Sequence, residues 1–231
     1  MSKISLILTT INEEKEIKKI IIKIQKSFTN YELIIVDDAS KDNTINIIKS
    51  LKDENIKIIQ RKNKQDLASA IYRGVIESSG KYICWLDVSM DYHIDNIKSE
   101  IINLEKNDII VFSRYIENGD DHRDWIRKNS SLLINYFAKI VLTFKIKDYT
   151  GGLFLMNRYV LDYVLPINYG HGEYFIHFIY KCYLNNLKIK FSPVVYKAEN
   201  NNNSKTFKSY YIFFKLGLKY IHRIIIARLK V

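Results

Sequence analysis

The segment Trp85–Asp95, WLDVSMDYHID, carries Asp87, Ser89 and Asp91 at every second position. The apolar run KYICWL leads into it and is typical of a buried strand, so these three side chains stand where that strand ends. In extended backbone, residues two apart point to the same side. Carboxylate and hydroxyl oxygens are ligands that hard divalent cations prefer. The spacing therefore indicates a site at which Asp87 and Asp91 hold Mg²⁺ or Mn²⁺ and Ser89 adds a hydroxyl or a water.

Polar side chains also follow the other apolar runs of the first half. Asp37 and Asp38 end the run YELIIVDD, where like charges repel each other unless a ligand or a cation uses them. Asp42 and Thr44 are instead in position to cap the next helix. The remaining polar residues at these ends are Thr10, Asn12, Glu13, Ser40, Ser113 and Arg114.

Short apolar runs alternate with helical patterns through the first half of the chain. The runs are ISLILT, YELIIVD, IKIIQ, YICWLD and DIIVFS, and helical patterns lie between them at 13–27, 43–53, 66–78 and 94–105. This order predicts an α/β fold, a doubly wound and mainly parallel sheet with helices on both faces. Ligands of such sheets bind beyond the carboxyl ends of the strands, which is where the polar residues stand.

Length and composition predict one folding unit with an anionic partner. The chain has 231 residues, 47% of them hydrophobic, and a formal net charge of +11. Cys84 and Cys182 lie in apolar segments and are expected to be reduced, buried thiols. We expect no signal peptide, because KISLILTT is only a strand's length, and no transmembrane helix. The protein is therefore expected on the cytoplasmic side of a membrane.

Seven motifs occur in the order and spacing of family 2 glycosyltransferases, namely LILTTINEE, ELIIVDDASKDNT, LASAIYRG, WLDVSMDYH, VFSRY, DYTGG and the late NSK. From residue 3 to about residue 207 the chain resembles this family, whose fold is GT-A, and within it the polyprenyl-phosphate (dolichyl-phosphate) sugar transferases of the mannose synthase type. The resemblance implies an inverting, metal-dependent transfer of a hexose from a nucleotide-diphosphate sugar to a polyprenyl phosphate of the dolichyl or undecaprenyl type. The cation would stabilise the departing diphosphate.

The resemblance also implies roles for individual residues. The donor nucleotide is expected to contact Thr9, Asn12, Glu13, Asp37, Asp38 and Ser40. The implied catalytic residues are Asp87, Asp91, Arg114, Arg127 and Lys205, with Asp87, Ser89 and Asp91 at the metal. The acceptor phosphate is expected on Arg127, Ser131, Ser204 and Lys205, although Arg127 also fits a solvated helix position. The chain departs from the family in having Ser89 for a second acidic residue, His177 for a glutamate and Glu199 for an arginine.

The C-terminal segment predicts a basic amphipathic helix. We expect a catalytic domain over residues 1–203 and a helical tail over 204–231 that has no acidic residue. Its cations recur at intervals of seven, four, four and seven, which places them on one helix face, at Lys208, Lys215, Lys219, Arg223 and Lys230. Beside an aromatic and aliphatic surface, this stripe favours an anchor on an anionic membrane surface. The alternative is a helix packed on the protein's own core.

Two other functions stay open at this stage. A family 2 glycosyltransferase acting on a saccharide hydroxyl would need a base, for which Glu173 and His177 are candidates. A non-catalytic nucleotide-binding or membrane-scaffold protein is the other. Binding of nucleic acid is disfavoured, because the cluster at the strand ends is acidic and the excess positive charge lies in the tail. The donor base, the oligomeric state and a membrane partner subunit are left open.

Overall fold

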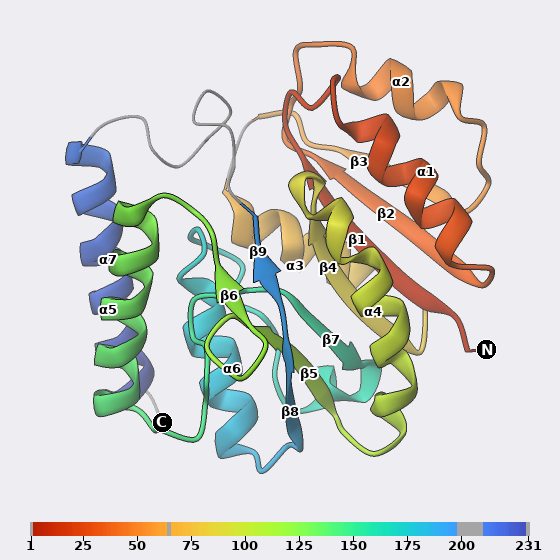
Figure 1. The fold of residues 1–231 in the computed structure, drawn as a ribbon. Helices are drawn as coiled ribbons and strands as arrows, with labels where there is room; N and C mark the ends of the chain where they lie inside the picture. The colour runs from red at the N-terminus through yellow and green to blue at the C-terminus, as the bar shows by residue number, and fades with distance from the viewer. Residues whose placement is uncertain (1, 64–65, 198–209, 230–231) are drawn as a thin grey trace.

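The computed structural model describes residues 2–63, 66–197 and 210–229. Within them a seven-stranded sheet has the order β3-β2-β1-β4-β7-β5-β8, in which β7 alone runs antiparallel to its neighbours (Figure 1). Beside it, two short strands form a parallel pair, β6 (Asp120–Asp121) and β9 (Val195–Tyr196). The strands of the large sheet are β1 (Ile4–Thr10), β2 (Tyr31–Asp37), β3 (Ile56–Gln60), β4 (Tyr82–Asp87), β5 (Ile109–Ser113), β7 (Phe154–Asn157) and β8 (Ile189–Pro193).

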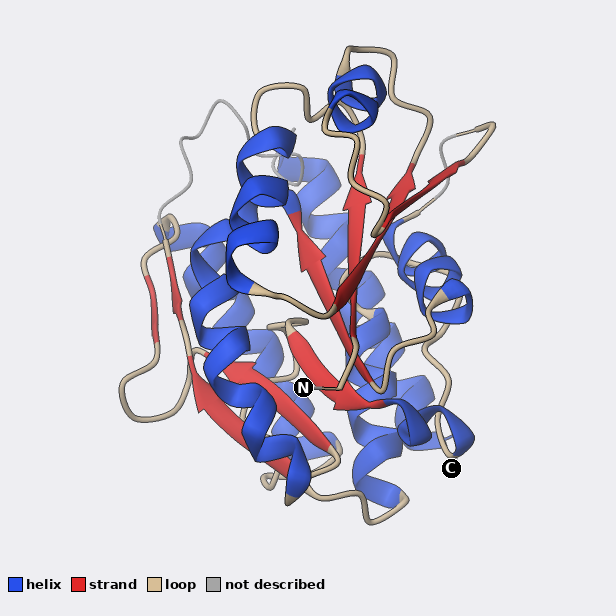
Figure 2. Cartoon of the chain, turned by 90° about the vertical axis from the view of Figure 1, so that its right-hand side faces the viewer, coloured by secondary structure: helices blue, strands red, loops and turns tan. Residues whose placement is uncertain are grey.

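Helices cover both faces of this sheet, as Figure 2 shows, so its central strands are apolar on both sides. One face packs against α1 (Ile17–Ser27), α2 (Thr44–Ser50) and α4 (Ile94–Glu100), which 3-10 turn η2 (Ile101–Glu105) continues. The other packs against α3 (Leu67–Glu77), α5 (Trp125–Val141) and α6 (Tyr174–Leu184), with 3-10 turn η3 (Arg158–Asp162) after β7. The alternation of strands and helices confirms the predicted fold class.

Helix α7 (Tyr210–Leu229) is built into the second of these layers. It lies against α5 and α6 at the edge of the molecule (Figure 1), and Ile224 and Ala227 are buried in the core that those helices share with the sheet. The described part of this helix thus packs on the protein's own core, which was the alternative to a membrane anchor. None of the helices in the described residues is long and apolar enough to cross a membrane.

The expectation of extended backbone from Asp87 to Asp91 is wrong. Residues Val88–His93 form a 3-10 helix, η1, immediately after β4. The carboxylate of Asp87 begins it, because Asp87 Oδ1 accepts hydrogen bonds from the Ser89 backbone N–H at 3.0 Å and from its hydroxyl at 2.8 Å. Because this capping interaction begins a helical turn, the side chains after Asp87 do not alternate between two faces as they would in a strand. The two-residue spacing therefore does not place Asp91 on the same face as Asp87.

His93 ends η1 as a buried histidine. It packs between the rings of Tyr92 and Tyr196, and its Nε2 has no hydrogen-bond partner in the described residues. Burial, together with a smaller effect of the charge of Lys197, lowers the pKa of His93 from 6.5 to about 4, although the charge of Asp91 opposes the shift. The imidazole is consequently neutral in the folded protein throughout the physiological range.

Acidification is expected to destabilise the protein through His93. Because the unfolded chain takes up a proton near pH 6.5 and the folded chain does so only near pH 4, the free energy of unfolding should fall by about 2 kcal/mol between pH 7 and pH 5. Urea unfolding at the two pH values measures this fall. In the variant His93→Gln most of this pH-dependent fall in stability should disappear, whereas in His122→Gln, at an exposed site, the fall should remain. An equal pH dependence in His93→Gln would contradict the prediction.

Candidate active site

A cavity of about 710 Å³ lies at the carboxyl ends of β1, β2 and β4. The loop before α6 and the helix α7 form its other wall, so residues far apart in the sequence meet there. A second hollow, at the opposite end of the sheet around Lys81 and Asp108, lies at the starts of β4 and β5. Parallel α/β sheets bind ligands at carboxyl ends, which favours the first cavity as the active site. It is lined by Thr9, Thr10, Ile11, Asp38, Arg61, Asp66, Leu67, Ala70, Asp87, Tyr169, Gly170, His171, Glu173, Lys219, His222 and Arg223.

Asp38 reaches this cavity as one half of an ion pair. Its Oδ1 lies 2.9 Å from Nη2 of Arg61, which comes from the end of β3, and both side chains are nearly buried. Thr9 lines the cavity from β1 and lies 3.5 Å from the indole Nε1 of Trp85. Of the residues expected at the donor nucleotide, Thr9 and Asp38 are therefore at the cavity surface.

Asp37 is buried on the other side of the strand. Its carboxylate accepts from the Thr10 hydroxyl at 3.1 Å, from the Ser40 backbone N–H at 3.0 Å and from the Ser40 hydroxyl. Asp37 and Asp38 thus coexist because hydroxyl donors serve the first and a guanidinium serves the second. Neither Asp37 nor Ser40 lines the cavity, and no ligand is required to relieve the repulsion between Asp37 and Asp38.

Asn12 and Glu13 hold the loops after β1 and β2 together. The Asn12 backbone N–H donates to the Ser40 hydroxyl at 2.9 Å, and Asn12 Oδ1 accepts from the Lys41 N–H at 2.8 Å. The Glu13 N–H donates to the Thr44 hydroxyl at 2.8 Å. These contacts shape the rim of the site, while the cavity itself is lined by other residues.

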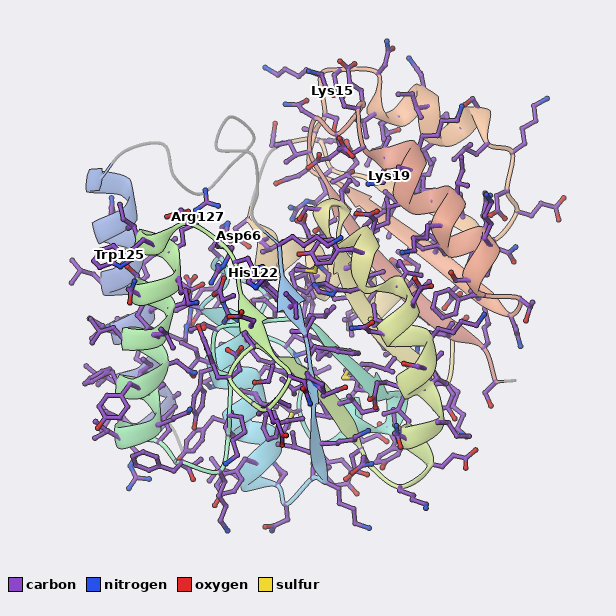
Figure 3. All side chains as sticks on the ribbon, in the orientation of Figure 1. Lys15, Lys19, Asp66, His122, Trp125 and Arg127 are labelled. Carbon is purple, nitrogen blue, oxygen red and sulfur yellow. The ribbon has the colours of Figure 1, made fainter. Side chains whose placement is uncertain are left out.

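Asp87 is the acidic side chain that β4 presents to the cavity. Ser89 donates two hydrogen bonds to Oδ1, and Oδ2 has no hydrogen-bond partner in the described part of the chain. Asp91 is instead directed to α1, where its Oδ2 lies 3.0 Å from Nζ of Lys19, a residue seen on the outer side of the molecule in Figure 3. This ion pair also raises the pKa of Lys19.

The described residues could hold a divalent cation if the bound substrate supplied some of its ligands. They contain no group of three or more histidine, cysteine or acidic side chains that could hold a metal by itself. Mg²⁺ is commonly bound by one or two carboxylates together with substrate phosphates and waters. One oriented carboxylate with a free oxygen, as at Asp87, matches that pattern.

Arg114 is enclosed in a buried ionic network next to the sheet. Its guanidinium is bidentate to Asp148, with Nε–Oδ2 at 3.0 Å and Nη2–Oδ1 at 2.9 Å, and Nη1 lies 3.2 Å from Asp121. Burial raises the pKa of Asp148, but the charge of Arg114 and the hydrogen bonds that Arg114 and Thr150 donate together outweigh this effect and hold that pKa below its usual range. Arg114, expected near the phosphates, does not line the cavity and supports the end of β5 from within.

The residues expected at the acceptor phosphate are only partly within the described chain. Arg127 is nearly buried at the start of α5, where its Nε lies 3.0 Å from Asp124. Arg127 does not line the cavity. The Ser131 hydroxyl accepts from Nη2 of Arg123 at 3.0 Å. Ser204 and Lys205 lie outside the described residues, as does Glu199.

Sequence reasoning missed the wall formed by α7 and the loop at 169–173. Lys219 and Arg223 had been assigned to a stripe facing a membrane, yet both line the cavity. Glu173 is 2% exposed and reaches the cavity at the start of α6, whereas His177, one turn further on, does not line it. The four-residue interval between Lys219 and Arg223 was a usable signal that both share a helix face, but it does not say which neighbour that face meets.

The arrangement of strands and helices and the position of the cavity are those of the GT-A fold of glycosyltransferases. Glucosyl-3-phosphoglycerate synthase from Mycobacterium tuberculosis, solved with phosphoglyceric acid, superposes with a TM-score of 0.74 at 15% identity, covering 100% of this chain and 81% of that chain. The same enzyme, solved with Mn²⁺, UDP and glucosyl-3-phosphoglycerate, gives a TM-score of 0.72 at 15% identity, again covering all of this chain and 81% of the other.

The chain belongs to Glycosyl transferase family 2, which it matches over residues 5–165. It is 30% identical over 168 residues to a dolichol-phosphate mannosyltransferase from Pyrococcus furiosus, covering 69% of this chain and 47% of the relative. It is 25% identical over 172 residues to an undecaprenyl-phosphate 4-deoxy-4-formamido-L-arabinose transferase from Proteus mirabilis, covering 71% of this chain and 52% of the relative. The chain thus spans about half the length of these curated relatives.

Proposed function

We propose that this protein transfers a hexose from a nucleotide-diphosphate sugar to a polyprenyl phosphate at a membrane surface. Its family and two relatives that use dolichol phosphate or undecaprenyl phosphate support this class of reaction. The cavity supplies a donor site, with Thr9 and the Asp38–Arg61 pair at the nucleoside and Asp87 at the diphosphate. The phosphate oxygen of the acceptor would attack the anomeric carbon while the diphosphate departs with the bond's electron pair.

In this proposal Asp87 binds Mg²⁺ or Mn²⁺ together with the donor phosphates. The cation would supply Lewis-acid neutralisation of the departing diphosphate. Ser89 holds the carboxylate of Asp87 in place through two hydrogen bonds, so that its free oxygen is oriented before the donor arrives. The chain's own contribution is thus positioning and electrostatics rather than covalent chemistry.

The observation that best supports a lipid acceptor is that two adjacent helices expose apolar side chains. Helices α5 and α7 lie side by side, and each exposes large hydrophobic side chains at helical intervals. Soluble monomers rarely expose so many in one region. We call the exposed apolar side chains of the two helices, taken together, the apolar face; they are Trp125, Leu133, Tyr136 and Ile140 of α5 and Leu218, Ile221, Ile225 and Leu229 of α7.

Acidic substitutions on the apolar face should release the protein from membranes. Each buried leucine or isoleucine contributes about 1.5–3 kcal/mol, so Leu133→Asp with Ile140→Asp should weaken binding to anionic vesicles at least about tenfold. Co-sedimentation with vesicles containing phosphatidylserine measures the change. Ile102→Asp, at an exposed apolar residue of η2, is the matched control and should bind as the wild type does. Undiminished binding of the double variant would contradict membrane docking through this face.

The phosphate acceptor is tested directly by comparing acceptors. A phosphate monoester is largely ionised at neutral pH, so it needs cations rather than a base, and we assign that role to Arg127 and Lys205 with Ser131 and Ser204. Thin-layer chromatography of products from GDP-mannose or UDP-glucose should show transfer to a short polyprenyl phosphate. Transfer only to a saccharide, or to 3-phosphoglycerate, would overturn the proposed acceptor.

Glu173 supports a second candidate, transfer to a saccharide hydroxyl. Its carboxylate is buried at the cavity, and Oε2 accepts from the His171 backbone N–H at 2.9 Å. A hydroxyl acceptor must lose its proton, and a carboxylate in this position could take it. Under this candidate Glu173→Gln would abolish transfer to saccharide, whereas a phosphate acceptor would not require Glu173 as a base.

A further inference from the structure

We propose that helix α7 is a wall of the donor site and that Arg223 binds the diphosphate of the nucleotide sugar. The proposal rests on the donor site proposed above and adds to it a residue of the C-terminal helix. Its basis is a buried guanidinium that lines the cavity and that has no carboxylate partner among the described residues.

Arg223 is 6% exposed, yet it lines the cavity. Its Nη1 donates to the Tyr169 hydroxyl at 3.1 Å, and its guanidinium carbon lies 4.7 Å from the centre of the Tyr169 ring. In residues 2–63, 66–197 and 210–229 it makes no ion pair, and its Nε has no hydrogen-bond partner. A buried charge without a counter-ion is costly, so the arrangement favours an anion that enters the cavity.

Two acidic groups of the cavity are already satisfied by the protein. Asp38 is paired with Arg61, and Asp66 caps α3 by accepting from the Ser69 backbone N–H at 2.8 Å. Neither is therefore available to neutralise Arg223. Glu173 also lines the cavity and, like Arg223, lies beside Gly170, but within the described residues it forms no ion pair with Arg223 and accepts instead from the His171 backbone N–H.

The carboxylate of Asp87 and the cations of α7 lie on opposite walls of the cavity. Asp87 stands at the end of β4, whereas Lys219 and Arg223 stand on α7 and share a helix face because they are four residues apart. Lys219 is exposed at the rim of the cavity and forms no ion pair in the described residues. A nucleotide diphosphate bound with a cation at Asp87 would present its other oxygens to this basic wall, where guanidinium binds phosphate in charge-assisted hydrogen bonds.

Packing of the neighbouring residues of α7 fixes the position of Arg223. Tyr220 packs directly on Gly172, where a Cβ would overlap the tyrosine hydroxyl. The same loop is tied to α3, since the Ala68 N–H donates to the Gly170 carbonyl at 3.0 Å. Ile224, beside Arg223, is fully buried. The guanidinium is thus held in place before the ligand binds, which lowers the entropy cost of binding.

The test measures binding of GDP and of UDP, each with MnCl₂, by isothermal titration calorimetry. Arg223→Gln keeps much of the side-chain volume but removes the charge, and it should weaken the nucleoside diphosphate that binds the wild type by about tenfold to a hundredfold. The effect should be smaller for the corresponding nucleoside monophosphate, and Arg223→Lys should recover part of the affinity. If Arg223→Gln binds the diphosphate as the wild type does, the proposal is overturned.

The nucleoside monophosphate and one control variant separate diphosphate binding from a structural role. If Arg223→Gln lost as much affinity for the monophosphate as for the diphosphate, Arg223 would only support the loop that it contacts through Tyr169, and the proposal would be overturned. Lys215→Ala, at an exposed position of the same helix, should not change binding. If the wild type binds neither nucleoside diphosphate, the proposed donor site itself fails, which is a different result from unchanged binding in Arg223→Gln.

Discussion

The variant Asp87→Asn should lose turnover by about 10³-fold, because it removes the carboxylate charge at the departing diphosphate while keeping the size of the side chain. The asparagine oxygen can still accept from Ser89, so the turn of η1 should persist. The measurement is release of nucleoside diphosphate from the donor in the presence of polyprenyl phosphate and MnCl₂.

Asp95→Asn is the matched control for this loss. Asp95 lies in the first turn of α4, two residues after η1; it is exposed and pairs with Lys23 at 3.1 Å. Its turnover should equal that of the wild type. Turnover of Asp87→Asn within a factor of a few of the wild type would refute the assignment of the diphosphate to this carboxylate.

The variant Arg114→Met should lower the free energy of unfolding by about 3–5 kcal/mol, which is the usual cost of leaving a buried charge without its partner. Asp148 would bear most of the loss, because it is fully buried and bidentate to Arg114, whereas Asp121 keeps Arg123 at 2.6 Å. Urea unfolding at pH 7 measures the change.

Two variants show whether the loss comes from the buried charge. Adding Asp148→Asn to Arg114→Met should recover part of the stability, since it removes the carboxylate that would otherwise stay unpaired. Arg73→Met breaks an exposed pair with Glu77 and should change stability by less than about 1 kcal/mol. Equal unfolding midpoints for Arg114→Met and the wild type would contradict the structural role of the network.

The sequence predicted the site best where a residue's direction depends on its own strand. Thr9 and Asp87 reach the cavity because parallel strands end at one edge of the sheet, which the order of apolar runs already indicates. It predicted poorly where a local turn intervenes. Asp91 shares a face with Asp87 only in extended backbone, and the capping of η1 by Asp87 removes that condition.

Long-range partners explain the other differences. Asp37 and Asp38 are neighbours with the same charge, but the hydroxyls of Thr10 and Ser40 serve one and Arg61 of another strand serves the other. Arg114 was expected at the phosphates and is enclosed by carboxylates from two later segments. No periodicity in the sequence states which of several acidic residues will meet a given arginine.

By itself the sequence determined the order of strands and helices, the family, and the edge of the sheet at which the cavity lies, because these follow from hydrophobic periodicity and from motifs within short segments. The tertiary structure alone decided which polar residues face the cavity and what α7 contacts. The spacing of Lys219 and Arg223 places them on one helix face in any environment. Only the packing of Tyr220 on Gly172 and of Ile224 in the core turns that face toward the cavity.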